Sequence, residues 1–553
     1  MDNIRLFLWV AVGVLFWLNY QAWMQDYAPT PPAETRQPGP APEPLSGTES
    51  DLPSLPVEAP AATEVPRLTG PEQPAAQALP PTVRITTDVL EAELSLTGGD
   101  LVRVELPGYP KEKGRPDVPV RLLDYEPSER FLIQTGLRSA AGGPEPNHLA
   151  SFQSDQQTYS LGADQDTLSV PLRWLGPQGQ VAATKVFTFS RGSYQIDVEL
   201  VVDNQSADSV AVAPYVQLAR RHKPIERSFT SVESYSYRGP ILYNGEKYDK
   251  LDPEDLATEP VAATLTGGWL ASIQHHFLAA AVPPADQEVR YQATARADQY
   301  LLSALGPVSR VTPGATARFP MTLFIGPKLQ SQLEQAAPGL KLTVDYGVLT
   351  LLAQPLFWLL SKVHDLVGNW GWAIVIVTLL IKLAFYKLTA TSGRSMAKMR
   401  KLQPRIKALQ ERYKDDRQAL GQQMMELYKR EKVNPAAGCL PILIQMPFFF
   451  AFYWVLIESV EMRQAPFMLW IADLSVRDPF FVLPLLNGAA MFLQQRLSPA
   501  PPDPVQAKVM QFMPVVFSVM FAFFPAGLVL YWLTNASLSI LQQWRINKVI
   551  GAD

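Results

Sequence analysis

The residue with the clearest chemical potential is Lys382, a lone cation inside the apolar run WAIVIVTLLIKLAFY of residues 372–386. A Lys at the centre of a membrane span costs roughly 2.5–3.5 kcal/mol on insertion scales, so its surroundings should hold water or an acidic group. An ammonium group there can bind a carboxylate, which makes Lys382 a candidate binding residue. Alternatively, its side chain extends to the nearer interface, because Lys387 lies only about 7.5 Å further along a helix.

Polar side chains recur in the apolar segments that follow. They are Gln445, Asn487, Gln511, Ser518, Thr534, Asn535, Ser537 and Ser539. Hydrogen bonds between neighbouring helices can explain any one of them. Together with Lys382 they predict a hydrated cavity that opens toward the positively charged side of the bundle.

Five apolar segments of helix length are predicted to span a membrane after the β-rich region. They are residues 370–386, 440–457, 480–493, 509–524 and 527–541. The third and fourth are short, about 21 and 24 Å as helices against a hydrocarbon core of about 30 Å, so they should thin the bilayer. A further span at 4–23 lacks an A-x-A cleavage pattern, which favours an uncleaved anchor at 1–25 over the alternative of a cleaved signal peptide. The prediction is a protein of six spans with both termini in the cytoplasm.

A basic block separates the first two of these five segments. Between Lys387 and Lys432 there are 13 Lys or Arg against 5 Asp or Glu, a local charge of +8 in a chain whose net charge is −4. Such an excess beside membrane spans marks the cytoplasmic side.

Within 392–432 the apolar residues step by three and four on either side of Asp415 and Asp416. This spacing predicts an antiparallel two-helix hairpin. Its exposed cations would be Lys398, Arg400, Lys401, Arg405, Lys407 and Arg412. They suit the phosphates of anionic lipid or ribosomal RNA, although a purely topogenic role is the alternative.

The region before the spans is different in character. Residues 26–82 are rich in Pro with few aromatic residues, which predicts a disordered tether. From 83 to 340, short alternating runs divided by turn residues predict an antiparallel β-sandwich. The adjacent His275 and His276 would point to opposite faces of a strand, and the only cysteine, Cys439, excludes an intrachain disulfide.

Residues 341–368 change to helical spacing, interrupted by Pro355 and ended by Gly368. The pattern predicts an amphipathic helix at the membrane interface; the alternative is a longer, kinked span. No G-x-S-x-G, H-E-x-x-H or Walker A motif occurs in the sequence. Hydrolases and nucleotide triphosphatases of those types are therefore not indicated.

Several motifs together resemble the YidC, Oxa and Albino family of membrane protein insertases. They are SMAKMRKLQP at 395–404, EKVNPAAGCLPILIQMP at 431–447, RQAPF at 463–467, FMP at 512–514 and FPAGLVLYW at 524–532. The resemblance covers the whole chain: anchor, tether, β-supersandwich periplasmic domain, amphipathic helix and five-span core at 369–553 follow in the family's order. It implies that newly made integral membrane proteins are inserted and helped to fold, without cofactor, metal or covalent chemistry.

The resemblance also implies a groove in the inner leaflet, open to cytoplasm and lipid, whose cation receives the polar tail of an incoming protein. Lys382 occupies the cation's position, where most relatives carry Arg. Arg stays charged, whereas a poorly hydrated Lys can lose its proton. The expected groove residues are Lys382, Thr378, Gln445, Gln511, Tyr531, Trp532 and Asn535.

The partners implied are nascent membrane proteins, the ribosome, the Sec translocon and anionic lipids, with no DNA. The protein would act as a monomer in the inner membrane of a Gram-negative-type cell. Two other classes are open. A secondary transporter is disfavoured because the five core segments show no matching halves, and a sugar-epimerase-like activity of the β domain rests on fold analogy alone. Deleting about 92–320 would abolish an enzyme but leave an insertase largely active.

Overall fold

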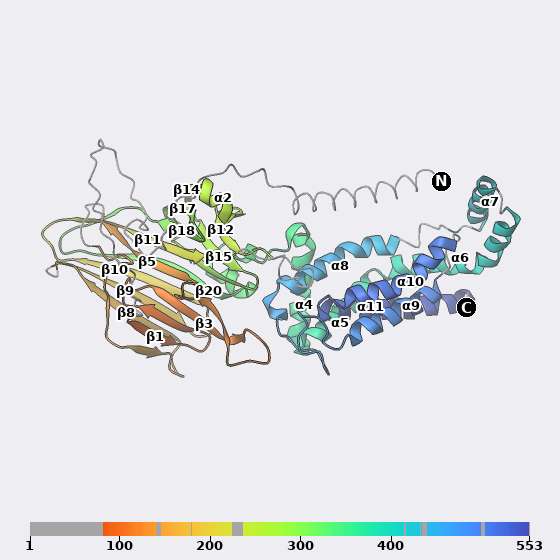
Figure 1. Ribbon diagram of the computed structural model, residues 1–553, viewed down its shortest axis with the longest axis horizontal. Coiled ribbons are helices and arrows are strands. Elements are labelled where there is room, and N and C mark those ends of the chain that lie inside the picture. The colour runs from red at the N-terminus through yellow and green to blue at the C-terminus, as the bar shows by residue number, and fades with distance from the viewer. Residues whose placement is uncertain are drawn as a thin grey trace, which may run out of the picture.

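The computed structural model describes residues 81–139, 145–177, 180–223, 236–413, 416–431, 433, 440–498 and 504–551. The predicted anchor at 1–25 and almost all of the predicted tether at 26–82 lie outside these residues. The described chain has a β-rich part followed by a helical part, which lie end to end along the long axis (Figure 1).

Two sheets make up the β-rich part. The first has the order β14 (Val261–Thr266), β17 (Glu288–Arg296), β18 (Gln299–Leu305), β11 (Val210–Arg221), β5 (Phe131–Ser139), β3 (Leu101–Pro110), β2 (Glu91–Ser95), β1 (Thr82–Thr86), β7 (Thr158–Ser160), with β19 (Ser309–Val311) paired to β11 and β4 (Pro119–Leu123) to β3. The second has the order β13 (Tyr248–Lys250), β12 (Gly239–Tyr243), β15 (Trp269–Gln274), β16 (Phe277–Val282), β20 (Thr316–Pro327), β10 (Gln195–Asn204), β9 (Val181–Ser190), β8 (Thr167–Leu175), β6 (Gln153–Ser154). The predicted antiparallel pairing is confirmed for the pairs between these strands except β1 with β7, which is parallel.

Alternation in the sequence explains how the sheets pack. In β9 and β10 the buried residues alternate with less buried ones, and most of the buried residues are apolar, including Phe187, Phe189, Ile196, Val198 and Leu200. Because successive side chains of a strand point to opposite faces, these residues meet the other sheet while the residues between them face outward.

One ion pair is buried between the two sheets. The ammonium of Lys185 on β9 lies 3.4 Å from Asp100 Oδ1 and also donates to the carbonyl oxygens of Gly98 and Thr135. Asp100 Oδ1 accepts the Thr135 N–H at 3.1 Å. Burial raises the pKa of Asp100 and lowers the pKa of Lys185, because each loses water around its charged form. The pair is therefore held by its own hydrogen bonds and by mutual attraction.

Removing one partner of this pair should destabilise the β-rich part strongly. We expect Lys185→Ala to lower the free energy of unfolding by about 3–5 kcal/mol, since it leaves a buried carboxylate without its cation. Arg173→Ala is the matched control, because Arg173 pairs with Asp155 on the surface, and it should cost under about 1 kcal/mol. Urea titration of the full chain in detergent micelles measures both. Equal losses would contradict the role given to burial.

The β-rich part also carries the short helices α2 (Pro253–Thr258) and α3 (Gln330–Ala336) and ends in the 3₁₀ turns η4 (Leu340–Thr343) and η5 (Gly347–Leu349). The helical part contains α4 (Thr350–Val367), α5 (Trp370–Ala384), α6 (Tyr386–Arg412), α7 (Arg417–Arg430), α8 (Leu440–Glu458), η7 (Val460–Met462), α9 (Val482–Leu497), α10 (Pro504–Phe521) and α11 (Ala526–Ile550). Each of the five apolar segments predicted to span after the β-rich region lies largely in a helix. Helix α11 runs through the bundle and packs against α5, α6, α8 and α9, whereas α10 packs mainly on α9.

Judged singly by length and apolar content, none of the described helices is sufficient to cross a bilayer. Helices α5 and α6 meet that standard only as a pair, across a bend of 71°, and residues Lys508–Phe521 form a shorter apolar helix.

The prediction of one continuous amphipathic helix from residue 341 is wrong at its beginning. The helix begins at Thr350, since Gly347 adopts φ 58° and the preceding residues form separate 3₁₀ turns. From there the predicted face is buried at Leu356, Leu360 and Val363. The opposite face of α4 exposes apolar residues too, among them Leu351, Trp358 and Leu366.

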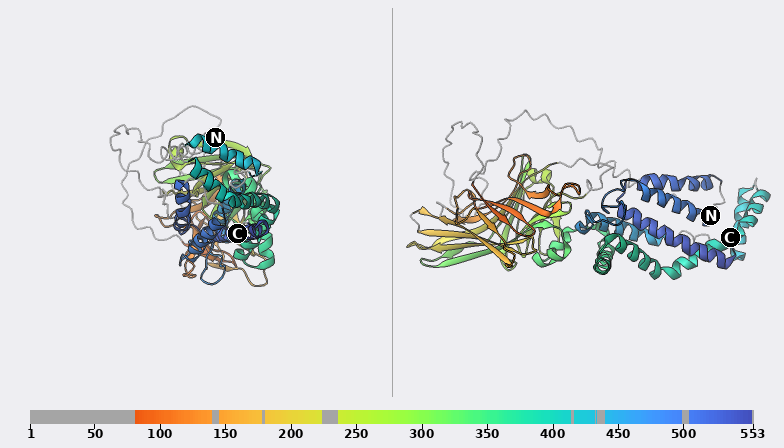
Figure 2. Two further views of the ribbon diagram at one scale, coloured as in Figure 1. Left: turned by 90° about the vertical axis from the view of Figure 1, so that its right-hand side faces the viewer. Right: turned by 90° about the horizontal axis from the view of Figure 1, so that it is seen from below.

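The predicted two-helix hairpin is present as α6 and α7, and it lies at the end of the bundle away from the β-rich part (Figures 1 and 2). Its seam buries Leu402, Ile406 and Leu427. Its first helix begins earlier than predicted, at Tyr386 rather than 392, so the hairpin continues directly from α5. Asp416 caps α7 by accepting the N–H groups of Gln418 and Ala419.

Candidate functional site

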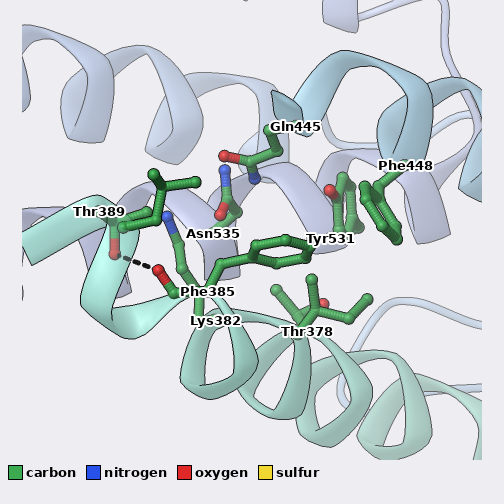
Figure 3. A pocket seen from close by; sticks show the side chains of 10 residues that line it. Thr378, Lys382, Phe385, Thr389, Gln445, Phe448, Tyr531 and Asn535 are labelled. Atoms are coloured by element: carbon green, nitrogen blue, oxygen red, sulfur yellow. Dashed lines mark hydrogen bonds between the residues drawn. The ribbon is translucent and has the colours of Figure 1, made fainter. Parts of the chain in front are cut away.

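A pocket lies between α5, α6, α8 and α11. Its walls are Thr378, Ile381, Lys382, Phe385, Leu388, Thr389, Gln445, Phe448, Tyr531 and Asn535. Five of the seven residues predicted to line a groove, Lys382, Thr378, Gln445, Tyr531 and Asn535, thus surround one space, and the close view shows Lys382, Gln445 and Asn535 pointing into it (Figure 3). The lining is mixed: four side chains are hydrocarbon and the other six carry a polar group.

Lys382 is partly buried in this pocket. Its Nζ donates a hydrogen bond to Ser539 Oγ on α11 at 2.8 Å, and Ser539 Oγ in turn donates to the carbonyl oxygen of Asn535 at 2.7 Å. No carboxylate of the described residues forms a salt bridge with Lys382. An ammonium has three donors, so the serine satisfies one of them and leaves capacity for an anionic group.

The other polar groups of the pocket are held by their own helices or left open to it. Thr378 Oγ1 donates to Ile374 O at 2.6 Å, and Thr389 Oγ1 donates to Phe385 O at 3.1 Å. Within the described residues, Asn535 Oδ1 is buried without a hydrogen-bond partner. Such an atom needs a polar partner, which water or a bound chain can supply.

Two predicted groove residues lie elsewhere. Gln511 is exposed on α10, which packs on α9 and does not line the pocket. Trp532 follows Tyr531 on α11 but turns to a different side, where its ring packs against Phe449 at 4.9 Å and Phe521 at 5.4 Å between centroids. Trp532 is therefore not among the residues that line the pocket.

The predicted hairpin cations are far from the pocket, on the outer surface of α6. Lys398, Lys401, Arg405, Lys407 and Arg412 are exposed, and Arg400 is half-buried. Within the described residues Arg405 Nη1 lies 2.7 Å from Glu431 Oε1, and Lys401 Nζ donates to Ile550 O at 3.4 Å. The remaining cations give this end of the molecule a positively charged face.

Sequence reasoning missed several pocket residues. Phe385, Leu388 and Thr389 come after the end of α5, and the 71° bend at Phe385 brings them back over the pocket. Ser539 was noted as polar but not as the partner of Lys382. Its position two turns after Tyr531 on a helix was the available signal, since residues separated by seven or eight positions share a face.

The pocket offers hydroxyl, amide and ammonium groups, which can form hydrogen bonds and attract an anionic group. Within the described residues there is no cluster of three or more His, Cys, Asp or Glu side chains able to hold a metal ion.

The outer end of α8, which contributes Gln445 and Phe448 to the pocket, is fixed to the β-rich part by a polar joint. We call this joint the clasp: Glu458, Ser459, Glu461 and Arg463 on one side, and Pro110, Ser236, His276, Lys328 and Tyr346 on the other. Ser236 Oγ donates to Glu458 Oε1 at 2.6 Å, and Lys328 Nζ lies 3.5 Å from Glu458 Oε2. Tyr346 OH lies 3.2 Å from Ser459 Oγ, and Arg463 donates to Pro110 O at 2.7 Å.

The prediction that His275 and His276 point to opposite faces of a strand is wrong. His275 and His276 form the turn between β15 and β16 and their rings stack at 3.7 Å, so they do not point to opposite faces of a strand. Burial lowers the pKa of His276 to about 3, so its ring is neutral and its Nε2–H can donate to Ile457 O at 2.7 Å.

Glu461 is the clasp residue whose carboxyl group has a raised pKa. Its Oε2 is buried without a hydrogen-bond partner among the described residues. Burial raises the pKa of Glu461 to about 7, although Lys328 and nearby backbone groups draw it down. Near neutral pH this carboxyl is therefore close to its midpoint.

The chain matches two family descriptions over nearly all of its folded length. "YidC periplasmic domain" matches residues 82–359, and "60Kd inner membrane protein" matches residues 362–552. Two relatives named membrane protein insertase YidC are similar over all of this chain and 99% of their own: the one from Nitrosococcus oceani is 45% identical and the one from Methylococcus capsulatus 46%. A crystal structure of an active YidC insertase with its first transmembrane domain resolved is 18% identical, covering 84% of this chain and 92% of that one, with a TM-score of 0.37.

These relatives define the class as an integral membrane protein with a large periplasmic domain. The chain belongs to the YidC family of membrane protein insertases.

The clasp should weaken as pH rises. Because the folded pKa of Glu461 lies near 7 and above the ordinary 4.5, its stabilising contribution is present below pH 4.5 and is lost as pH rises through 7. We expect Glu461 to contribute a fall of about 1–2 kcal/mol in the free energy of unfolding between pH 5 and 8, and Glu461→Gln to lose that contribution, while the buried Asp100, whose pKa is also raised, keeps its own. Thermal unfolding in detergent micelles measures it.

Glu334→Gln is the control, because Glu334 pairs with Lys341 on the surface. It should retain the wild-type pH dependence. A pH dependence in Glu461→Gln equal to that of the wild type would show that another group is responsible.

Proposed function

We propose that the pocket around Lys382 holds the polar segment of a newly made membrane protein while the adjoining apolar segment moves into lipid. The chemistry needed is transient binding of a chain that must cross a membrane. The catalytic effect is a lower transfer barrier, and no covalent step is involved.

The observation that carries this proposal is that the Lys382 ammonium group has three hydrogen-bond donors and uses one of them within the described residues. Lys382 sits in a pocket with four hydrocarbon walls, and a serine hydroxyl is its hydrogen-bond partner within the described residues. An acidic group entering the pocket would find a donor in a medium where attraction between charges is stronger than in water. Thr389, Gln445 and Asn535 would offer hydrogen bonds to a passing backbone.

Exposed apolar surface supports the second half of the proposal. Helix α10 exposes Val509, Phe512, Val515, Val516 and Val519, and α8 exposes Met446 and Phe450. Contiguous apolar surface on a membrane protein faces lipid or a partner helix. A substrate's apolar segment would gain about 0.8 kcal/mol for each CH2 group that leaves water.

For the membrane arrangement we propose six spans: the anchor at 1–25, α5, α8, α9, α10 and α11. The β-rich part would lie in the periplasm, the α6–α7 hairpin and both termini in the cytoplasm, and α4 at the interface, with Trp358 and Leu366 toward lipid. The positive face of the hairpin supports this orientation. A membrane potential would then assist acidic tails moving outward by about 2.3 kcal/mol per charge and 100 mV.

The same face of the hairpin suggests the partners. Exposed Lys and Arg side chains on α6 would attract phosphate groups of ribosomal RNA or of anionic lipids. We propose that nascent chains arrive there, directly from the ribosome or beside the Sec translocon, and that one copy of the protein suffices.

The test of the pocket is charge removal at one position. Lys382→Ala should slow insertion of a single-span substrate with an acidic tail about tenfold, the equivalent of one lost charge-assisted hydrogen bond of about 1.4 kcal/mol. Lys382→Arg should retain insertion, because a guanidinium keeps the charge. Protease protection of the substrate in reconstituted vesicles gives the rate.

Lys387→Ala serves as the matched control, since Lys387 is exposed and lies outside the pocket. It should insert the substrate at the wild-type rate. Wild-type insertion by Lys382→Ala would remove the cation from the mechanism.

A further inference from the structure

Three amide side chains near the end of α11 join it to two other helices. Gln542 Nε2 donates to Thr389 Oγ1 at 3.0 Å, and Gln543 Nε2 donates to the Gly393 carbonyl oxygen at 3.2 Å, both on α6. Asn547 Nδ2 donates to Leu497 O at the end of α9 at 3.2 Å. We call Gln542, Gln543 and Asn547 the amide latch.

The latch is connected internally as well. Gln543 Nε2 also donates to Asn547 Oδ1 at 2.8 Å, and Asn547 is fully buried. Both polar ends of the Asn547 amide are therefore used. A buried network whose members are satisfied fixes one arrangement, because shifting a helix would leave a polar group without a partner.

Close packing under the latch depends on small residues of α6. Ala390, Gly393 and Ala397 are buried on the face that meets α11. A Cβ at Gly393 would lie 2.8 Å from Gln543 Oε1 and from Ile546 Cδ1. The absence of a side chain at Gly393 thus leaves room for the ends of these two side chains, including the Gln543 amide that reaches the α6 backbone.

Helix α6 connects the pocket to the hairpin. Its first turn contributes Leu388 and Thr389 to the pocket, and its last turns carry the seam with α7 at Leu402 and Ile406. It is one continuous helix of 27 residues, about 40 Å long. A rotation of α6 about the latch would move the pocket wall at one end and the hairpin at the other.

We propose that Gln543 and Asn547 are positioning residues that set the angle of α6 and thereby couple the place of the α6–α7 hairpin to the width of the pocket. This inference rests on the proposed function, because it assigns the latch a role in insertion. A partner that pulls the hairpin would move α6 and thereby open the pocket. The hydrogen bonds of the latch would then bring α6 back to its original position.

The test uses the full chain in lipid vesicles with Cys439→Ser as background. Spin labels at Glu426→Cys on α7 and Leu493→Cys on α9 report the distance from hairpin to bundle, both sites being exposed. Asn547→Ala and Gln543→Ala should each shift and broaden that distance and slow insertion about three- to tenfold, because each removes two hydrogen bonds of the latch. Gln422→Ala, an exposed amide on α7, should change neither.

Gly393→Ala is an independent variant that keeps all the amide side chains but places a methyl group where the Gln543 amide lies, so that this amide must leave its position beside the α6 backbone. It should move the distance and the insertion rate in the same direction. An unchanged distance in both Asn547→Ala and Gly393→Ala overturns the proposal, as does a changed distance with wild-type insertion.

A double-mutant cycle separates this inference from the proposed function. If the latch acts through the pocket, Asn547→Ala should slow insertion less in a Lys382→Ala background than in wild type. Additive effects would overturn the coupling while leaving the pocket's role intact. If Lys382→Ala alone inserts normally, the proposed function itself fails.

Discussion

An ammonium group in a largely hydrocarbon surrounding must find partners, and this constraint organises the helical part of the protein. Lys382 on α5 meets its partner on α11, where the Ser539 hydroxyl relays the bond to the Asn535 carbonyl. The contact requires α5 and α11 to lie side by side at this depth. Within the described residues it also leaves donors of the ammonium group without a protein partner, which is the basis for proposing that the pocket binds an acidic group.

Helices α11 and α8 provide several of the pocket residues, and each helix also contacts another part of the protein. Helix α11 supplies Tyr531, Asn535 and Ser539 around the cation and, further along, the amides that fix α6. Helix α8 supplies Gln445 and Phe448, and its outer end is held through Glu458 in the clasp. The walls of the pocket are thus anchored at opposite ends of the bundle, one by the β-rich part and one at the base of the hairpin.

Much of this arrangement was predictable where it follows from local spacing. The apolar segments located the helices, alternation located the β-sandwich, and a lone cation in an apolar run located the pocket. Spacing could not reveal that Gly347 divides the segment before α4, because 3₁₀ and α turns place apolar residues almost alike. Nor could it orient Trp532, since the motif shared with relatives names residues without saying which side of α11 each faces.

The contacts of the clasp and of the amide latch could not be predicted from the sequence, and the reason is different. Lys328 and Glu458 are 130 positions apart, and Gln543 and Gly393 are 150 apart. The spacing of residues within one helix or strand cannot reveal these residue pairs, because they meet only when several elements pack together. A polar residue at a helix end is usually solvated, so the sequence alone did not indicate that Glu458 and Asn547 are buried.

The two joints also differ in chemistry, and the difference has a physical consequence. The clasp is built from buried ionisable groups, and the raised pKa of Glu461 places its titration near neutral pH. The latch is built from neutral amides, whose hydrogen bonds do not change with pH. The end of the bundle that meets the β-rich part therefore responds to proton concentration, whereas the end at the hairpin does not. With α8 held by the first joint and α6 by the second, we expect a change of pH to act on the α8 wall of the pocket and a displacement of the hairpin to act on the α6 wall, where hydrogen bonds of the latch must break.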